Sequence, residues 1–275
     1  MTEDKCLATL RNFRLIDDVF FSACFDNNER DVEYILRIIL DKPNLTVLKV
    51  QTQKSVENIY GRSVRFDVFA SDDSGKLYNI EVQRTDAGAV PSRARFNSSL
   101  LDYHHLKKQA KFSELPETFV IFITEHDVLK GEKQIYHVNR IIRETGEDFG
   151  DGTHIIYVNA SYRKNDGSAL SNLIHDFFCA NPADMKHRQL AKRVSFLKNN
   201  KHGVRKMSSI IREIFRQEIE EASAEVAAEV ATETERNTLL GNIRNLMETM
   251  KWTATQAMDA LKLSADKQKE LLNFI

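Results

Sequence analysis

Residues Val64–Gln83 constrain the fold of this chain more than any other stretch, because they read as two strands joined by a tight turn. Apolar and polar residues alternate along both halves, and an alternation with a period of two is typical of strands. The segment between the halves, Ser71–Gly75, consists of turn-forming residues. The sequence therefore predicts an antiparallel hairpin at this point.

The length of the hairpin loop decides where two acidic side chains point. We expect Ala70 to pair with Lys76 across a five-residue loop. Asp67 and Glu81 then share one face of the hairpin as diagonal neighbours, roughly 7–8 Å apart at the backbone. A four-residue loop would place the two carboxylates on opposite faces, because a shift of one residue turns every side chain over. A shared site for both acids therefore requires an odd number of loop residues.

Two carboxylates in this arrangement suit a divalent cation. Mg²⁺ prefers oxygen ligands and usually takes one or two protein carboxylates. The main-chain carbonyl of Val82 offers a further ligand, and the amide of Gln83 can orient an attacking water. A bound cation lowers the pKa of water and offsets charge on a phosphate. Acids at strand ends are also commonly solvated, so the spacing by itself leaves both interpretations open.

The rest of the chain predicts an α/β domain followed by helices. Glu29–Leu40 reads as an amphipathic helix, and Arg93–Phe112 as a second helix with Ser92 as its N-cap. Glu117–Thr124 reads as a strand that is buried on both faces. The order strand, helix, strand predicts a crossover that places this strand beside the hairpin. Shorter strands are expected at Leu45–Val50, Ile135–Arg140 and Ile155–Asn159.

From Ser168 onward the sequence predicts almost only helix. Glu213–Glu235 is rich in Glu and Ala and has few large apolar residues after Ile219, which indicates a solvated connector or a helix that needs a partner. In the tail, Thr253 and Ser264 read as N-caps of two short helices that resemble a helix-turn-helix in outline. We interpret the tail as a packing or dimerisation element. The expected organisation is a core at residues 1–165, a helical extension at 166–235 and a small helical tail at 236–275.

Charge and cysteine content narrow the functional classes. The formal net charge is −1, so binding of nucleic acid would require a local basic face. The three scattered cysteines, Cys6, Cys24 and Cys179, indicate reduced thiols in a cytoplasmic protein. The chain has no run of about 18 apolar residues, so we expect no membrane span.

Two stretches supply the Lys and Arg side chains that binding of DNA phosphates needs. One follows the hairpin directly, and the other, Lys186–Lys206, contains no acidic residue. A solvated helical face explains the second stretch equally well, and Arg93 and Arg95 also suit ion pairs with the acidic hairpin loop. The candidates for DNA contact are Arg84, Arg93, Arg95, Lys192 and Arg193.

The hairpin residues resemble the PD-(D/E)xK nuclease superfamily, and within it the transposase-like branch that includes the recombination-promoting nucleases. In this branch an aspartate on one strand is followed across a hairpin by E-x-Q, here Asp67 and Glu81-Val82-Gln83. The flanks D-V-F-F at Asp18–Phe21 and R-A-R-F-N-S-S-L-L-D-Y at Arg93–Tyr103 are also similar to the branch. The superfamily often has lysine where Gln83 stands, and proline where Phe66 stands. The resemblance covers roughly residues 12–215.

The resemblance implies a restriction-endonuclease-like core with a helical C-terminal extension. It implies a Mg²⁺-dependent DNA endonuclease linked to recombination or mobile elements, in which Mn²⁺ can replace Mg²⁺. Asp67, Glu81 and the Val82 carbonyl would hold the metal, and Gln83 would position the water. The alternative is a catalytically inactive DNA-binding or assembly protein on a nuclease scaffold. A homodimer through the C-terminal helices is compatible with either function.

Overall fold

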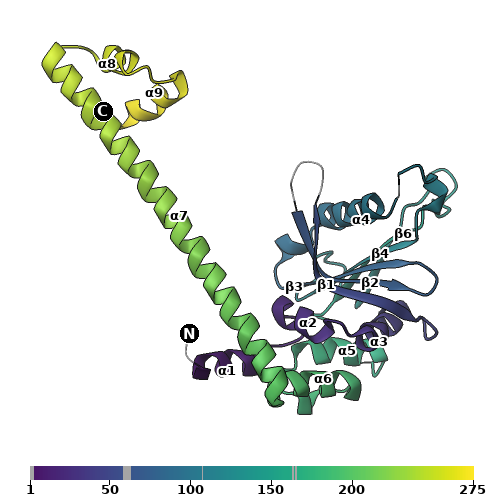
Figure 1. The fold of residues 1–275 in the computed structure, drawn as a ribbon. Helices are drawn as coiled ribbons and strands as arrows, with labels where there is room; N and C mark the ends of the chain where they lie inside the picture. Colours follow the sequence, from purple (N-terminus) through teal and green to yellow (C-terminus); the bar gives the residue numbers. More distant parts are fainter. Residues whose placement is uncertain (1–2, 58–62, 107, 163, 165) are drawn as a thin grey trace. The chain divides into compact units, whose positions relative to one another are not determined.

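The computed structural model describes residues 3–57, 63–106, 108–162, 164 and 166–275. A six-stranded mixed sheet in the order β1-β2-β3-β4-β6-β5 lies at the centre of the first compact unit, residues 1–209 (Figure 1). The strands are β1 (Val47–Glu57), β2 (Ser63–Asp72), β3 (Leu77–Gln83), β4 (Thr118–Thr124), β5 (Ile135–Val138) and β6 (Thr153–Asn159). The predicted α/β fold with a mixed sheet is confirmed.

The middle of the sheet is parallel, and its central strand is the most apolar. All seven residues of β4 are buried, because the run T-F-V-I-F-I-T meets helices on both faces of the sheet. Strand β4 pairs in parallel with β3 on one side and with β6 on the other. The predicted crossover is therefore confirmed, and it carries the chain from the hairpin through α4 (Pro91–His105) into β4.

Helices cover both faces of the sheet, as Figure 1 shows. Helix α4 packs against β4 and β6 on one face, whereas α2 (Asp18–Phe25) packs against β1 and β2, and α3 (Glu29–Leu40) against β1, on the other. Helices α5 (Ala169–Phe178) and α6 (Arg188–Asn199) lie outside α2 and α3 and form an outer layer. This unit also contains α1 (Glu3–Asn12) and the first residues of α7 (Lys201–Met250).

The bounds of α4 differ from the expected Arg93–Phe112. The helix begins at Pro91, and Val90 rather than Ser92 is the N-cap residue. Proline suits the first helical position because its φ angle is already fixed and its missing N–H would have no partner there. The helix ends at His105, and Gln109 lies in the left-handed region with a φ of 73°, which no α-helix accommodates.

The register of the hairpin also differs from the expected one. Ala70 lies opposite Tyr78 rather than Lys76. The displacement is two residues, an even number, so the two acids still share one face. Continued along the strands, the observed register places Asp67 directly opposite Glu81 instead of diagonal to it. The requirement for an odd loop is met, because five residues separate the pair Ser71–Leu77.

Asp72 accounts for the shift in register by closing the turn with its side chain. Its Oδ1 accepts hydrogen bonds from the N–H groups of Ser74 and Lys76, and its Oδ2 accepts one from the hydroxyl of Tyr78 at 2.7 Å. Gly75 adopts a φ of 83°, which favours glycine. Strand β2 therefore continues through Asp72, two residues beyond the expected end.

Residues 210–275 form the second compact unit. Helix α7 (Lys201–Met250) is continuous through the expected connector at 213–235, and the division between the units falls inside it. The end of α7 packs with α8 (Ala254–Ala260) and α9 (Ala265–Leu271) around a small apolar cluster. The buried members of the cluster are Leu240, Ile243, Ala257, Met258 and Leu271. The domain limits at 165 and 235 remain predictions.

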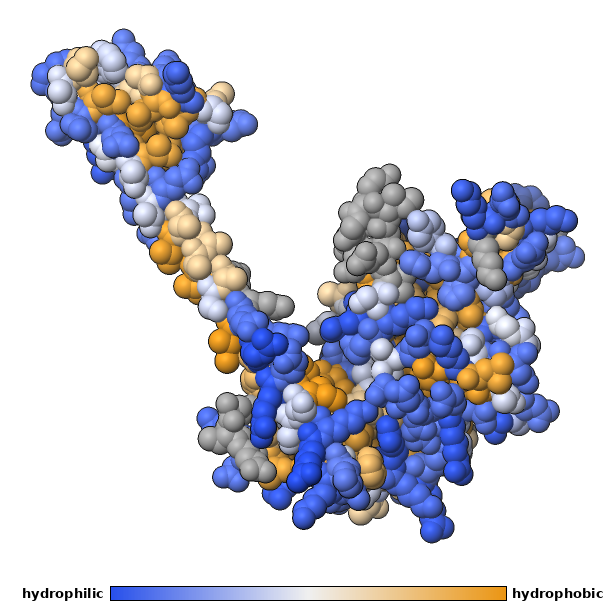
Figure 2. Space-filling model, viewed as in Figure 1, coloured by the Kyte–Doolittle hydropathy of each residue, from blue (hydrophilic) through white to orange (hydrophobic). Residues whose placement is uncertain are grey.

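The caps of the tail helices agree with expectation. The hydroxyls of Thr253 and Ser264 accept hydrogen bonds from the N–H groups of Gln256 and Lys267. Apolar side chains are exposed along α7, including Ile219 and the residues Val226 and Val230 (Figure 2). The homodimer through these helices stays a prediction. Within the described ranges, none of the helices has both the length and the apolar character that crossing a membrane requires.

Candidate metal centre

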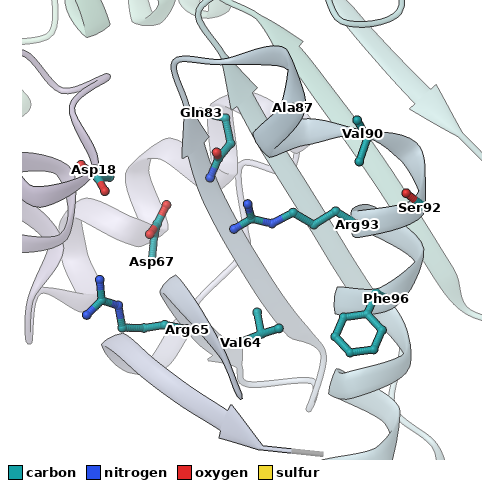
Figure 3. A pocket seen from close by; sticks show the side chains of 10 residues that line it. All are labelled: Asp18, Val64, Arg65, Asp67, Gln83, Ala87, Val90, Ser92, Arg93 and Phe96. Carbon is teal, nitrogen blue, oxygen red and sulfur yellow. The ribbon is translucent and has the colours of Figure 1, made fainter. Parts of the chain in front are cut away.

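Asp67 and Gln83 of the hairpin motif line a pocket of about 760 Å³, whereas Glu81 is fully buried and does not line it (Figure 3). The start of α2, strands β2 and β3, the 3₁₀ turn η1 (Asp86–Ala89) and the first two turns of α4 supply its walls. Asp67, Gln83 and Arg93 converge in one part of the pocket, whereas Val64 and Phe96 form an apolar wall in another. The pocket therefore combines a charged centre with an apolar surface beside it.

Asp67 and Glu81 are buried, with 8% and 0% of their surface exposed. The N–H of Val82 donates to Asp67 Oδ2 at 3.0 Å, in the place where β2 no longer pairs with β3. The N–H and C=O of one strand residue point to the same side, so the Val82 carbonyl also faces the side of Asp67. Glu81 Oε2 is 3.5 Å from an Arg93 nitrogen and accepts no hydrogen bond from the described residues.

Burial makes ionisation of this pair costly. The pKa of Asp67 is raised by desolvation, then by the charge of Glu81, against the opposing hydrogen bond from Val82. The pKa of Glu81 is raised by desolvation, against the opposing hydrogen bond from Asn79 and the charge of Arg93. A divalent cation between the carboxylates would supply the positive charge that Arg93 alone does not. The donor set of two carboxylates and a carbonyl fits Mg²⁺ or Mn²⁺.

Two buried asparagine side chains form a chain of hydrogen bonds that ends on the Glu81 carboxylate. Asn79 Nδ2 donates to Glu81 Oε1 at 2.6 Å, and Asn97 Nδ2 of α4 donates to Asn79 Oδ1 at 3.0 Å. All three side chains have 0% of their surface exposed. The carboxylate fixes the direction of both hydrogen bonds, because it can only accept while ionised. Sequence reasoning missed both asparagines as site residues, although Asn79 is two residues before Glu81 and therefore shares its face.

A third acid also lies at the pocket. Asp18, the first residue of α2, lines the same wall, and its charge contributes to the raised pKa of Asp67. Arg65 of β2 lines the pocket near Asp18 and Asp67 in Figure 3. The motif D-V-F-F marked Asp18 as part of a flank, whereas no pattern in the sequence indicated Arg65.

Gln83 reaches the pocket from the end of β3 and packs beneath η1. A Cβ atom on Gly88 would lie 1.9 Å from Gln83 Oε1, so only glycine leaves the amide in its observed place. Gln83 is half-buried and lies in the same part of the pocket as Asp67 in Figure 3, and its role in orienting a water stays a prediction. The sequence did not indicate that Gly88 restricts this side chain.

Three of the five predicted DNA-contact residues already have partners within the protein, and one of them is Arg93, which pairs with Glu81. Arg84 is exposed, but its guanidinium pairs with Asp17 at 3.2 Å and Glu125 at 3.0 Å. Arg193 donates to the carbonyl oxygens of Ala23 and Cys24, which joins α6 to the end of α2. Arg84 and Arg193 therefore have structural roles that the charge pattern did not reveal.

Arg93 and the remaining two candidates differ in their positions. Arg93 lines the pocket, and Arg95 and Lys192 are exposed on α4 and α6. Within the basic stretch, Lys198 is buried and donates to the carbonyl oxygens of Arg11, Phe13 and Ala180. Part of the stretch therefore holds helices together instead of facing solvent.

A mixed sheet with helices on both faces, and paired acids on adjacent strands beside a pocket, defines a protein with a restriction-endonuclease-like fold. Comparison with protein families matches residues 26–248 to the PD-(D/E)XK nuclease family transposases. This chain belongs to that family. No curated protein and no solved structure matches it.

Proposed function

We propose that this protein is a Mg²⁺-dependent DNA endonuclease that acts in the cytoplasm in recombination or on mobile elements. The observation that supports this proposal best is the buried carboxylate pair, in which Glu81 has an oxygen without a hydrogen-bond partner among the described residues. A buried charge of this kind is costly unless it is paired, and a cation pairs with both acids at once. Family membership favours a nuclease over a structural metal site.

In this proposal Asp67 and Glu81, with the Val82 carbonyl, hold the metal. When bound, Mg²⁺ or Mn²⁺ would lower the pKa of a water and offset the charge of the attacked phosphate. The Gln83 amide orients the attacking water, and Arg93 neutralises the phosphate beside the carboxylates. Arg95 and Lys192 are exposed members of the proposed DNA-contact set, and contacts of this type make binding weaker as salt increases.

A plasmid-nicking assay tests the proposal. The unchanged protein should convert supercoiled plasmid to open circles in Mg²⁺ or Mn²⁺ and lose this activity in excess chelator. Glu81→Gln keeps the shape of the side chain but removes its charge, so it should abolish nicking. Asp73→Asn removes an exposed acid from the turn of the same hairpin and should leave nicking unchanged.

Two outcomes would contradict the endonuclease. If Glu81→Gln nicked plasmid as well as the unchanged protein, Glu81 would not be part of the catalytic site. Salt-sensitive DNA binding without nicking, and without calorimetric binding of Mn²⁺ or Mg²⁺, would establish the alternative, a non-cleaving DNA-binding protein on this scaffold.

Gly88→Ala should slow nicking by displacing Gln83 without unfolding the protein. The new methyl group meets only the end of a flexible side chain, so we expect the melting temperature to change little. A double-mutant cycle with Gln83→Ala provides the measurement, because two changes that act through one amide are not additive. Additive losses, or full activity in Gly88→Ala, would show that the position of Gln83 does not matter.

A further inference from the structure

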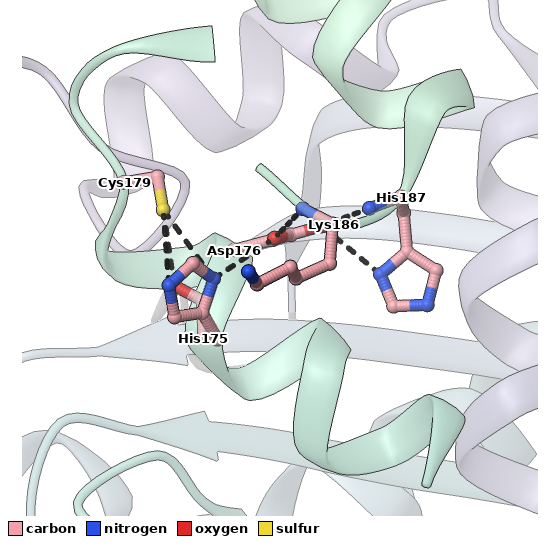
Figure 4. Close-up of polar contacts among 5 residues, drawn as sticks. All are labelled: His175, Asp176, Cys179, Lys186 and His187. Carbon is pink, nitrogen blue, oxygen red and sulfur yellow. Dashed lines mark hydrogen bonds and ion pairs between the residues drawn. The ribbon is translucent and has the colours of Figure 1, made fainter. Parts of the chain in front are cut away.

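A second group of metal-binding side chains lies at the end of α5, on residues that do not line the pocket of the carboxylate pair (Figure 4). His175 and Cys179 are one helical turn apart, and Asp176 follows His175 directly. One ligand atom from each of the three side chains lies within 4.8 Å of the other two. Imidazole, thiolate and carboxylate together are ligands that Zn²⁺ accepts.

Two of the three distances within the group match the edges of a tetrahedral site, and the third, between Cys179 and Asp176, is within 4.8 Å. The His175 Nδ1 and Cys179 Sγ atoms are 3.5 Å apart, and His175 Nδ1 and Asp176 Oδ1 are 3.2 Å apart. With the usual bond lengths of Zn²⁺, the edges of a regular tetrahedron measure about 3.5 Å between sulfur and nitrogen and about 3.3 Å between nitrogen and oxygen. The His175 side chain is 42% exposed, so its ring can turn toward a cation that arrives from solvent.

Asp176 is already oriented as metal-binding carboxylates usually are. It is fully buried, and it accepts hydrogen bonds from the N–H groups of Lys186 and His187 at 2.6 and 2.8 Å. The His187 ring nitrogen Nδ1 lies 3.0 Å from the same carboxylate. Such outer hydrogen bonds fix the geometry of metal ligands. A carboxylate has about four acceptor sites, and the fourth one faces His175.

The charge of Asp176 supports the same conclusion. Burial would raise its pKa, but the hydrogen bonds from His187 and from the Lys186 backbone bring the pKa below the usual value. The carboxylate is therefore ionised at neutral pH and can pair with a cation.

We propose that His175, Asp176 and Cys179 bind one Zn²⁺-type cation at a site separate from the carboxylate pair. The cation has three protein ligands and a water in the fourth position. The thiol proton of Cys179 passes to solvent when the sulfur binds. The hydrogen bonds from residues 186 and 187 to Asp176 link the end of α5 to the start of α6, and the cation binds next to this link. The soft sulfur ligand selects Zn²⁺ over Mg²⁺.

Titration of the full-length protein with Co²⁺ tests this site, because Co²⁺ bound by a thiolate absorbs in the near ultraviolet through sulfur-to-metal charge transfer. We expect this band to saturate at one equivalent, to be displaced by Zn²⁺ and to persist in excess Mg²⁺. Cys179→Ser should abolish the band. Cys24→Ala removes a fully enclosed thiol from α2 and should keep the band.

Two further variants separate this site from the proposed nuclease centre. Glu81→Gln should keep the cobalt band, because no sulfur lies in the carboxylate pair. His175→Ala should weaken Co²⁺ binding and reduce the rise in melting temperature that Zn²⁺ causes, since a ligand stabilises the fold by mass action. The absence of a band in the unchanged protein, or a full band in Cys179→Ser, would overturn the site whether or not the protein cuts DNA.

Discussion

Asp67→Asn should abolish metal-dependent DNA cleavage and also raise the melting temperature of the metal-free protein. The first effect follows from the loss of a ligand charge. Changes that only disturb the hydrogen bonds around a metal ligand already cost about 10–100-fold in affinity or activity, so we expect a loss at the upper end of this range or beyond. The second effect follows from burial, because 8% exposure leaves the Asp67 carboxylate with little water and Glu81 adds like charge.

The pH dependence of stability explains why Asp67→Asn should raise the melting temperature of the metal-free protein. An aspartate in the unfolded chain ionises near pH 4, whereas the folded protein raises the pKa of Asp67. Below about pH 4 the Asp67 carboxyl is protonated in both the folded and the unfolded protein, and it imposes no cost on folding. As the pH rises toward neutrality the unfolded chain gives up its proton more readily, so the metal-free protein loses stability. Asparagine has no proton to lose and removes this contribution.

Thermal melts in chelator between pH 5 and pH 8 provide the measurement. The melting temperature of the unchanged protein should fall as the pH rises, and the fall should be smaller in Asp67→Asn. For chains of about 150–250 residues, each kcal/mol corresponds to about 2–4 °C. Added Mn²⁺ should stabilise the unchanged protein but not the variant. Asp73→Asn serves as the control, and an Asp67→Asn protein that melts lower at pH 8 would contradict the argument.

The sequence predicted the elements whose pattern is local and strongly periodic. Helix α3 has its predicted bounds, and the apolar run at residues 117–124 is the buried central strand. The shared face of Asp67 and Glu81 survived an error of two residues in the hairpin register, because only the parity of the shift decides the face. The error itself came from Asp72, whose side chain closes the turn in a way that composition does not reveal.

What the sequence could not predict depends on contacts between distant segments. Arg84 and Arg193 looked like free cations because their partners, Glu125 and the end of α2, are 41 and about 170 residues away along the chain. A charge pattern shows that a segment contains basic residues, but it does not show whether the folded chain brings a carbonyl or a carboxylate group within reach of them. The same limitation hid Asn97, which reaches the candidate metal centre only because the fold brings α4 close enough for its side chain to donate to Asn79 of β3.

Asn97→Ala should weaken metal binding at the carboxylate pair although Asn97 contacts no metal. Asn79 can hold Glu81 Oε1 in place only while its own Oδ1 accepts the hydrogen bond from Asn97. Without that hydrogen bond the buried Asn79 amide has an unsatisfied oxygen and is free to rotate, which costs stability and releases Glu81. We expect the affinity for Mn²⁺ to fall by about 10–100-fold, the range observed when a partner of a metal ligand is removed.

Ser98→Ala is the matched control, because Ser98 is the next residue of α4, is 2% exposed, and has a hydroxyl without a hydrogen-bond partner among the described residues. It should leave the Mn²⁺ affinity unchanged and affect stability little, since replacing an unsatisfied buried hydroxyl by a methyl group removes no hydrogen bond. Calorimetric titration with Mn²⁺ and thermal melts separate the two roles of Asn97. A lower melting temperature with an unchanged Mn²⁺ affinity would mean that Asn97 only supports the core. Weaker Mn²⁺ binding in Asn97→Ala but not in Ser98→Ala would show that Asn97 positions Glu81. If Mn²⁺ binding depended only on packing in this part of α4, changes at these two adjacent buried residues would have similar effects.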